Sequence, residues 1–445
     1  MIRSRIAFVF GFFLLFVLAP ASRTQDSARQ AQLAERYPSL HEDNCVLHDF
    51  HFKSGETLPE LRMHYRTLGK PQRDASGRVT NAVMILHGTG GSGGGFLSPN
   101  YGGVLFEPGQ MLDANQYFII LPDNIGHGKS SKPSDGMHAH FPQYEYDDML
   151  LAQHELLEKG LGVNHLRLLM GTSMGCMHSW MWAETYPDYM DAVMPLACLP
   201  VQIAGRNRTW RKMVIDGIRE DPDWKGGEYT TEPRAGLQIA VDFLIIAGSA
   251  PVPMQKELPT RDAADKFLED TTARLLKGLD ANDMLYAVSS SRNYDPSGKL
   301  ESIKAPVMFV NSADDFINPP ELGIAEREIK RVKNGKFVLI PASEQTHGHG
   351  YAQLAGYLAA TLKRTARRIE ALSSRSSIPC NSGFRQAGSM TSGISLCAGH
   401  QEFRIQYSAY AGGTFKAGAA DVLRGWKHVW KNIGRLRRSF SVAMT

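Results

Sequence analysis

Apolar segments of strand length alternate with helical patterns through the middle of the chain. Six segments are mainly apolar: 82–87, 117–121, 166–170, 192–198, 306–310 and 336–340. Such continuous apolar runs are typical of strands in a sheet that is covered on both faces. Helical patterns occupy 147–159, 177–186, 321–331 and 351–371. This alternation predicts an α/β fold with a mostly parallel sheet flanked by helices.

The alternation also predicts the domain organisation. It defines a domain over residues 36–372 and is interrupted between about 202 and 293. The interrupted stretch has helical patterns, contains no clear buried strand and lies between two strands of the sheet. We therefore expect a helical insertion at one end of the sheet, where it could act as a lid.

The first 21 residues have the pattern of an export signal. Arg3 and Arg5 precede an apolar run over 6–19, and Ala19-Pro20-Ala21 matches an A-x-A cleavage site. The run is shorter than the roughly 20 residues of a membrane-spanning helix. We therefore expect a signal peptide over 1–21 and export to the periplasm or the medium, with an uncleaved membrane anchor as the alternative.

The last segment, 373–445, differs from the body in composition and charge. It is rich in Ser and Gly and lacks periodicity, which predicts disorder. Near its end, Val422, Trp426, Val429, Ile433 and Leu436 are spaced by four and three with Lys and Arg between them. This pattern is typical of a basic amphipathic helix that contacts a membrane surface, although a dispensable extension is the alternative.

Charge and cysteines narrow the class of protein further. From residue 372 onward the chain has ten Lys and Arg and two acidic residues, a net charge of +8. Because the whole chain has a net charge of +4, the residues before 372 have a net charge of −4. The residues before 372 therefore lack the excess of positive charge that is typical of a nucleic-acid-binding protein. The chain has five cysteines. We expect Cys176 and Cys198 to be core residues, and Cys380 and Cys397 could pair in the tail.

Two segments match the nucleophile pattern G-x-S-x-G. One is Gly171-Thr-Ser173-Met-Gly175 and the other is Gly90-Gly-Ser92-Gly-Gly94. A nucleophilic serine of this kind needs a strand before it and a helix after it. Ser173 follows the apolar run 166–170 and precedes a helical pattern, whereas a glycine run that cannot start a stable helix follows Ser92. The context therefore selects Ser173.

The glycine-rich loop at 87–94 has a second interpretation. Gly88-Thr-Gly90-Gly-Ser-Gly93 matches the dinucleotide fingerprint G-x-G-x-x-G, but that fingerprint requires a helix to begin there, and none is expected. The loop instead follows an early strand, the position from which hydrolases of this fold draw one oxyanion-hole N–H group. We expect Thr89 and Met174 to supply the two backbone donors.

An acid and a base follow in the order that an α/β hydrolase requires. The run 307–310 leads to Asp314 and Asp315, and the run 336–340 leads to His347 and His349. We favour Asp315, four residues before Pro319-Pro320, with Asp314 as the alternative. We favour His349, which directly precedes the last helical pattern, with His347 as the alternative.

Several segments together carry a family resemblance over residues 36–372. They are GTSMG, LPDNIGHGKSSKP (121–133), RNRTWRKMVIDGIREDPDWKGGEY (206–229), GLDANDMLY (278–286) and NSADDFINPP (311–320). On these motifs the chain resembles the homoserine O-acetyltransferase branch of the α/β-hydrolase superfamily. The resemblance implies a Ser173, Asp315, His349 triad and passage of an acyl group from a CoA thioester to the serine and then to a hydroxyl.

Two positions depart from that family pattern. The acetyltransferases usually carry Asp directly after the catalytic His, where it receives the amino group of homoserine, and this chain has Gly350 there. They read H-A-L-T-G at the oxyanion strand, and this chain reads His87-Gly-Thr-Gly-Gly91. These departures, together with export, slightly favour ester hydrolysis over CoA-dependent O-acyl transfer. A non-catalytic binding protein on the same scaffold is a third hypothesis.

The remaining expectations concern ligands and partners. The substrate is expected to be a small-molecule ester or acyl donor, with no cofactor, and with acyl-CoA as co-substrate if the protein is a transferase. Arg206, Arg208 and Tyr229 in the insertion are candidates for binding the acyl donor or acceptor, with surface salt bridges as the alternative for the arginines. No metal site is expected, because the histidines lack ligand spacing. The sequence leaves a homo-oligomer open.

Overall fold

The computed structural model describes residues 31–353. Residues up to Leu40, which include a helical stretch over 31–36, form one unit, and the chain from His41 onward forms another. The second unit contains one eight-stranded sheet in the order β1-β2-β4-β3-β5-β6-β7-β8. Its strands are β1 (His41–His51), β2 (Thr57–Leu68), β3 (Ala82–Leu86), β4 (Phe118–Pro122), β5 (Leu168–Thr172), β6 (Val193–Leu196), β7 (Val307–Ser312) and β8 (Gly335–Ile340).

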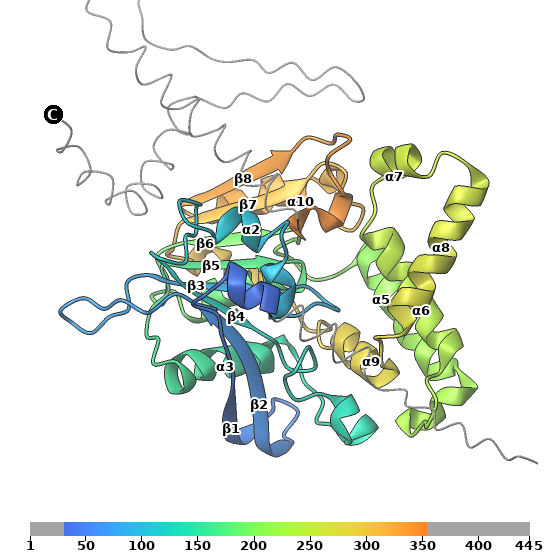
Figure 1. The fold of residues 1–445 in the computed structure, drawn as a ribbon, viewed down its shortest axis with the longest axis horizontal. Coiled ribbons are helices and arrows are strands. Elements are labelled where there is room, and N and C mark those ends of the chain that lie inside the picture. Colours follow the sequence, from blue (N-terminus) through green and yellow to red (C-terminus); the bar gives the residue numbers. More distant parts are fainter. Residues whose placement is uncertain (1–30, 354–445) are drawn as a thin grey trace, which may run out of the picture. The chain divides into compact units, whose positions relative to one another are not determined.

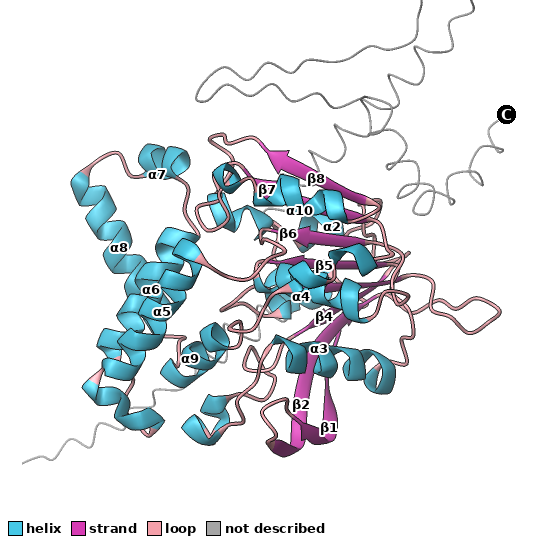
Figure 2. Ribbon diagram, turned by 180° about the vertical axis from the view of Figure 1, so that it is seen from behind, coloured by secondary structure: helices cyan, strands magenta, loops and turns pink. Residues whose placement is uncertain are grey.

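The six strands from β3 to β8 pair in parallel, as the apolar runs predict. β3, β4 and β6 are buried along their whole length because helices cover both faces of the sheet (Figures 1 and 2). The α/β-hydrolase architecture expected from the sequence is therefore confirmed. The bounds of these six strands differ from the expected ones by at most two residues at each end.

The sequence analysis missed an antiparallel hairpin at one edge of the sheet. β1 pairs with β2, and β2 pairs with β4, both antiparallel. In β2 the buried Leu61, Met63 and Tyr65 alternate with Arg62 and His64. This alternation of apolar and polar residues indicates a strand, but it is less conspicuous in the sequence than the continuous apolar runs of the central strands.

Helices fill the connections between the strands. They are α2 (Gly102–Leu105), α3 (Tyr146–Glu155), α4 (Met174–Thr185), α5 (Gly205–Glu220), α6 (Arg234–Ala247), α7 (Pro251–Glu257), α8 (Arg261–Leu276), α9 (Ala281–Ser289) and α10 (Ile324–Glu328). The pattern over 147–159 forms α3 and a following π-helical turn, and the pattern over 321–331 is broken into three short helical pieces. Of the pattern expected over 351–371, only 351–353 lie within the described residues, as the end of a 3₁₀ helix.

Helices α5 to α9 come between β6 and β7 in the chain, and Figure 1 shows α5, α6 and α8 side by side. Apolar side chains of α5, α6 and α9 form a hydrophobic cluster separate from that of the sheet, built on Val214, Ile218, Leu237, Ala240 and Leu285. Asp280 and Thr260 cap the first turns of α9 and α8 by accepting a backbone N–H group. The insertion therefore has a small core of its own.

The parallel register brings the ends of four strands to one edge. Leu86 at the end of β3 lies opposite Gly171 of β5, Thr172 opposite Leu196 of β6, and Leu196 opposite Val310 of β7. The loops that leave these strands therefore emerge beside one another, as ligand-binding loops do in open α/β sheets. The expected signal peptide (1–21) and tail (373–445) lie outside the described residues, as does the end of the expected domain beyond 353.

Candidate active site

Ser173 occupies a sharp turn between β5 and α4. Its φ and ψ are 53° and −110°, a conformation that a non-glycine residue rarely adopts. The flanking glycines allow the turn to be tight. A Cβ atom at Gly171 would lie 1.9 Å from the carbonyl oxygen of Gly175, and one at Gly175 would lie 2.1 Å from that of Leu86. The turn therefore presents the serine hydroxyl at the carboxyl edge of the sheet.

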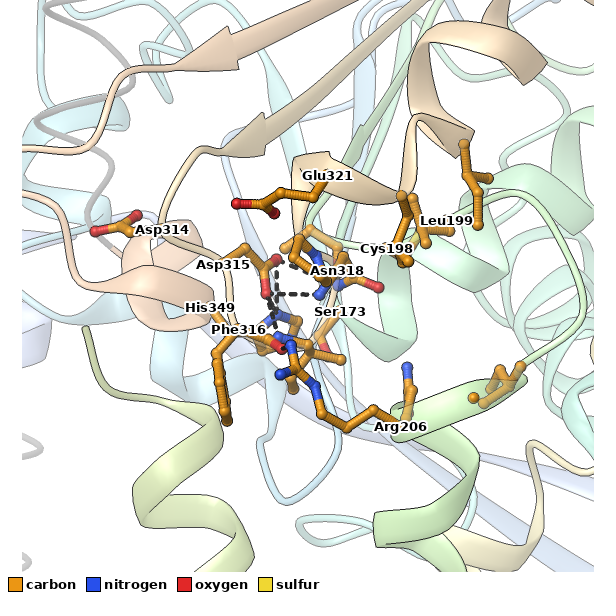
Figure 3. Close-up of a pocket in the computed structure, with 18 of the residues that line it drawn as sticks. Ser173, Cys198, Leu199, Arg206, Asp314, Asp315, Phe316, Asn318, Glu321 and His349 are labelled. Carbon is orange, nitrogen blue, oxygen red and sulfur yellow. Dashed lines mark hydrogen bonds and ion pairs between the residues drawn. The ribbon is translucent and has the colours of Figure 1, made fainter. Parts of the chain in front are cut away.

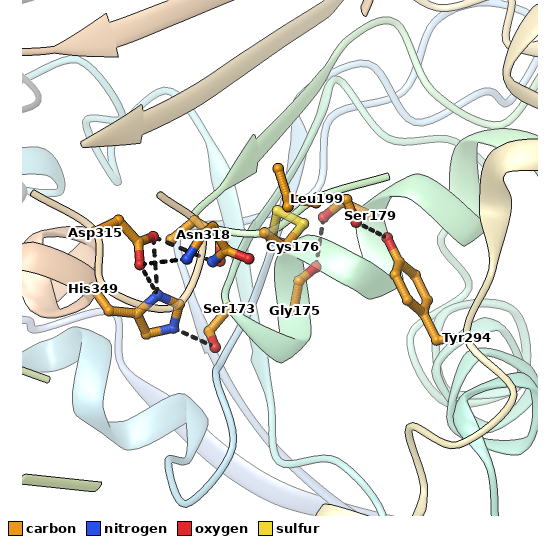
Figure 4. The surroundings of a disulfide bond; sticks show 11 residues. Ser173, Gly175, Cys176, Ser179, Leu199, Tyr294, Asp315, Asn318 and His349 are labelled. Carbon is orange, nitrogen blue, oxygen red and sulfur yellow. Dashed lines mark hydrogen bonds and ion pairs between the residues drawn. A yellow bond between two sulfur atoms is a disulfide. The ribbon is translucent and has the colours of Figure 1, made fainter. Parts of the chain in front are cut away.

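His349 connects this hydroxyl to a carboxylate. Its Nε2 lies 2.8 Å from Oγ of Ser173, and its Nδ1 lies 3.1 and 3.2 Å from the two carboxylate oxygens of Asp315 (Figures 3 and 4). Because an ionised carboxylate can only accept, Nδ1 carries the proton, and Nε2 is free to accept the serine hydroxyl. The imidazole is thus oriented to take a proton from Ser173.

The Asp315 carboxylate is buried and kept ionised. Burial by itself would raise its pKa, but the charge and hydrogen bond of His349 and the hydrogen bonds of Asn318 outweigh burial, so the pKa lies below its usual range. The backbone N–H groups of Ile317 and Asn318 donate to Oδ1 at 2.9 and 3.0 Å. A charge at this position stabilises the imidazolium that forms when His349 accepts a proton.

Asn318 is a residue that the sequence analysis did not identify. Its side-chain amide donates to Oδ2 of Asp315 and to the carbonyl oxygen of Ala197, both at 3.2 Å, and its side chain is buried. It therefore ties the loop after β7 to the loop after β6. The spacing Asp-x-x-Asn, in which the acid also accepts the Asn backbone N–H group, is the signal that could have indicated it.

Asp314 and His347, the alternatives for the acid and the base, are not hydrogen-bonded to Ser173 or to His349 within the described residues. The Asp314 carboxylate accepts a 2.6 Å hydrogen bond from Thr346 and another from Ser312, and Figure 3 shows it turned away from His349. His347 contributes only its carbonyl oxygen, which accepts the Gly350 N–H group. The structure brings Ser173, Asp315 and His349 together and leaves Asp314 and His347 out of this hydrogen-bonded chain.

The loop after β3 lies against Ser173. A Cβ atom at Gly88 would be 3.1 Å from that of Ser173, so only glycine fits there without displacement. The ring of His87 braces the loop, because its Nδ1 donates to the Gly88 carbonyl oxygen and its Nε2 accepts the Asn124 N–H group. Thr89 follows directly. Met174 is the first residue of α4, where backbone N–H groups lack partners within the helix.

The second G-x-S-x-G match has a different environment. Ser92 precedes a short 3₁₀ helix, Gly93–Leu97, which the sequence analysis did not expect. The Gly93 N–H group donates to the buried carboxylate of Asp123, and the backbone of Leu121 lies within 2.4 Å of where a Cβ atom at Gly93 would be. This stretch packs against the end of β4, and no histidine of the described residues is hydrogen-bonded to Ser92.

Cys176 and Cys198 are buried, as expected for core residues. They also form a disulfide, which the sequence analysis did not predict (Figure 4). The register of β5 and β6 brings the start of α4 next to the loop after β6, and the bond joins the first turn after Ser173 to that loop. Cys45, partly buried in β1, is free.

The hydroxyl of Ser173 opens into a cavity of about 1190 Å³. Its walls come from the loop after β6, from the ends of α5 and α6, and from the loop after β7, and most of its lining side chains are apolar. Within residues 31–353, no group of three or more His, Cys, Asp or Glu side chains is placed to hold a metal ion.

The three substrate-binding candidates of the insertion lie in different places. Arg206 lines the cavity, with its guanidinium 3.9 Å from the ring centre of Phe316 and bonded to the Phe316 carbonyl oxygen (Figure 3). Arg208 is partly buried and is not among the lining residues. Tyr229 is buried in the apolar cluster of the insertion, where its hydroxyl accepts the Asn282 N–H group, and it does not reach the cavity either.

Comparison with known proteins agrees with this geometry. Residues 81–344 match the family described as alpha/beta hydrolase fold. A probable acyltransferase of Methanothermobacter thermautotrophicus is 31% identical over 277 residues, covering 62% of this chain and 83% of that protein. A homoserine O-acetyltransferase of Moorella thermoacetica is 30% identical over 361 residues, covering 70% of this chain and 93% of that protein.

A solved structure has the same fold. The acetylester hydrolase from Corynebacterium glutamicum superimposes with a TM-score of 0.63 at 19% identity and covers 73% of this chain and 95% of that chain. The sequence relatives and the structural neighbour thus include both acyl-transferring and ester-hydrolysing proteins.

Proposed function

This chain belongs to the α/β-hydrolase fold family, in its homoserine O-acetyltransferase-like branch, and on that premise we propose that it is an exported serine enzyme that hydrolyses small-molecule esters through an acyl-enzyme. The observation that carries the proposal is the hydrogen-bonded chain from Ser173 through His349 to Asp315. A hydroxyl, a base and an orienting acid in this geometry are what nucleophilic catalysis by serine requires.

The reaction proceeds in two halves. His349 takes the hydroxyl proton as Oγ of Ser173 bonds to the ester carbonyl carbon, and the proton then passes to the departing alcohol as the ester C–O bond breaks. In the second half a water molecule gives its proton to His349 and attacks the acyl-enzyme. The carboxylic acid leaves, and Ser173 regains its proton.

The backbone N–H groups of Thr89 and Met174 would hold the negative oxygen of each tetrahedral intermediate. The close approach of Gly88 to Ser173 and the place of Met174 at the start of α4 support this assignment. Donors arranged in advance at the developing charge contribute about 3 kcal/mol each in serine hydrolases. The helical insertion, α5 to α9, would act as a lid over this site.

Hydrolysis is tested with purified protein and p-nitrophenyl acetate. Ser173→Ala should lower kcat/KM by at least about a thousandfold. Ser92→Ala, in the other G-x-S-x-G match, should retain the rate of the unaltered protein. A fluorophosphonate probe should label the unaltered protein and Ser92→Ala but not Ser173→Ala. Equal hydrolysis by both variants, with no labelling, would leave a binding protein as the better description.

CoA-dependent O-acyl transfer is the second candidate, supported by the names of the sequence relatives. In that reaction an alcohol takes the place of water, and acyl-CoA is a co-substrate. Gly350 in place of the Asp that binds the amino group of homoserine favours hydrolysis. The test is CoA release from acetyl-CoA with and without hydroxy acids and amino acids. Acceptor-dependent release that exceeds hydrolysis would reverse the order of the two candidates.

Export is supported by the N-terminal pattern and by the disulfide, since disulfides persist in oxidising compartments. N-terminal sequencing of protein recovered from the periplasm or the medium should begin at Ser22. Recovery only with membranes and an intact N-terminus would favour an uncleaved anchor.

A further inference from the structure

A buried arginine that plays no part in the proposed mechanism lines the same cavity as Ser173. Arg211, on the first half of α5, is 6% exposed. Its Nε donates to Asn207 at 3.0 Å and its Nη1 to Ser291 at 2.9 Å. Both partners are neutral. Among the described residues, no carboxylate lies within ion-pair distance of this guanidinium.

Burying a cation without an anionic partner costs free energy, and the positive charges nearest to Arg211 increase that cost. Burial lowers the pKa of Arg208, and the positive charges of Arg292 and Arg211 lower it further. Arg208 is partly buried and Arg292 is exposed, and within residues 31–353 neither side chain has a hydrogen-bond partner in the protein. The one carboxylate that acts in the opposite direction, Asp216, is bound by Lys212.

The carboxylates of the cavity do not compensate for Arg211. Asp315 is held by His349, and Asp314 is held by Thr346. Glu321 is exposed. The guanidinium of Arg206, in contrast, already has partners, because it stacks on the Phe316 ring and donates to the Phe316 carbonyl oxygen. Arg211 is therefore the buried guanidinium that faces the cavity without an anionic partner within the described residues.

Hydrogen bonds link the surroundings of this guanidinium to the loop after β6, which also lies beside Ser173. Ser291, which accepts from Arg211, lies three residues before Tyr294, and the Tyr294 hydroxyl donates to the Leu199 carbonyl oxygen. Leu199 and the disulfide-bonded Cys198 line the cavity together with Ser173 and Arg211. The serine and the guanidinium therefore belong to the wall of one cavity.

We propose that Arg211 binds a carboxylate of the substrate, so that this enzyme acts on esters that also carry a free carboxylate group. The inference rests on the proposed hydrolase function and specifies its substrate class. A guanidinium has five N–H donors, of which two are hydrogen-bonded here, and the buried Tyr146 hydroxyl also lies close to it. The remaining donors can bind a carboxylate, whose shape matches the planar fork. The bound anion would also offset the repulsion among Arg208, Arg211 and Arg292.

Matched pairs of esters test the proposal, and they separate the two places where the carboxylate could be. Monomethyl glutarate against methyl glutaramate examines the acyl side, and acetoxyacetate against acetoxyacetamide examines the alcohol side. Hydrolysis is followed by pH-stat. For at least one pair, the unaltered enzyme should show a kcat/KM about tenfold or more higher for the carboxylate than for the amide.

Arg211→Gln should lower that preference to about one while retaining the rate on the amide ester within about threefold. Arg219→Gln, which removes an exposed arginine of the same helix, should leave the preference unchanged. A general loss of structure would instead lower both rates together. If Arg211→Gln does not fold, Arg211→Lys, which keeps the charge but loses the fork, should lower the preference several-fold.

Binding without turnover gives an independent readout. Glutarate should raise the melting temperature of Ser173→Ala, glutaramide should not, and Arg211→Gln or Arg211→Lys in that background should weaken the glutarate effect. Absence of a carboxylate preference in both ester pairs, or its retention in the Arg211 variants, overturns the proposal. If no ester is hydrolysed, the proposed function fails, and the glutarate measurement alone decides the role of Arg211.

Discussion

Nδ1 of His349 donates to the carboxylate of Asp315, with 3.1 Å between Nδ1 and Oδ2, and this bond decides which ring nitrogen faces Ser173. The neighbouring acid, Asp314, has the same chemistry and lies one residue earlier, but it bonds to Thr346 instead. Both residues lie in the loop after β7, which directs one carboxylate to Thr346 and the other to His349. The pair Asp314 and Asp315 therefore offers a matched test of the proposed catalytic acid.

Asp315→Asn should lower kcat by roughly ten-thousand-fold, because an amide that donates to Nδ1 would place the imidazole proton on the nitrogen facing Ser173. Asp314→Asn should lower kcat by less than about tenfold. The measurement is steady-state hydrolysis of p-nitrophenyl acetate, with circular dichroism to check the fold. Similar losses for both variants would contradict the assignment of Asp315.

The disulfide should stabilise the folded protein. Cys176 and Cys198 are 22 residues apart, and a closed loop of that length corresponds to about 3 kcal/mol in the free energy of unfolding. Urea unfolding of the double variant Cys176→Ala, Cys198→Ala should show this loss. Cys45→Ala, which removes the free thiol, should lose less than about 1 kcal/mol. A double variant as stable as Cys45→Ala would mean that the bond contributes nothing.

The turn around Ser173 should not tolerate a side chain at Gly175. An added Cβ atom would lie 2.1 Å from the carbonyl oxygen of Leu86, a backbone atom that cannot move without displacing β3. We expect Gly175→Ala to lose about 3 kcal/mol or more of stability, together with activity. Gly95→Ala, where nothing lies within 4 Å of the added atom, is the control and should remain within about 1 kcal/mol. Thermal melting of both variants is the measurement, and equal melting temperatures would refute this account of the turn.

Stability should fall as the pH drops below about 6.5 because of three buried histidines. Burial lowers the pKa of His87 and of His178 and lowers that of His127 to about 3. Repulsion by His87 lowers the pKa of His127 and of His178 further. Depressed pKa values mean that the unfolded chain, whose histidines titrate near pH 6.5, binds more protons than the folded protein. Unfolding is therefore favoured progressively from about pH 6.5 toward pH 3.

Urea unfolding between pH 7.5 and 5 tests this pH dependence. His178→Gln removes one of the three groups and should reduce the slope by up to about 1.4 kcal/mol per pH unit. His48→Gln, at an exposed position of β1, is the control and should keep the slope of the unaltered protein. Identical slopes for the two variants would show that His178 is not responsible.

The sequence by itself determined the six parallel strands of the sheet and the three residues that the structure joins at their carboxyl ends. Continuous apolar runs predict the parallel strands because a strand covered on both faces must be apolar along its length. The strand before Gly171 and the helical pattern after Gly175 distinguished Ser173 from Ser92. The order of serine, acid and histidine at three strand ends then indicated the remaining members, which the structure joins by hydrogen bonds.

Only the tertiary structure decided which side chains meet across those strand ends. The partners of Asp314 and Asp315, the bond between Cys176 and Cys198, and the amide of Asn318 all depend on the register of β5, β6 and β7. Register is not encoded in the local pattern of any one strand. The same holds for Arg211, which the sequence shows only as one of several arginines in this stretch. Packing buries it in the wall of the cavity, and no carboxylate within residues 31–353 pairs with it.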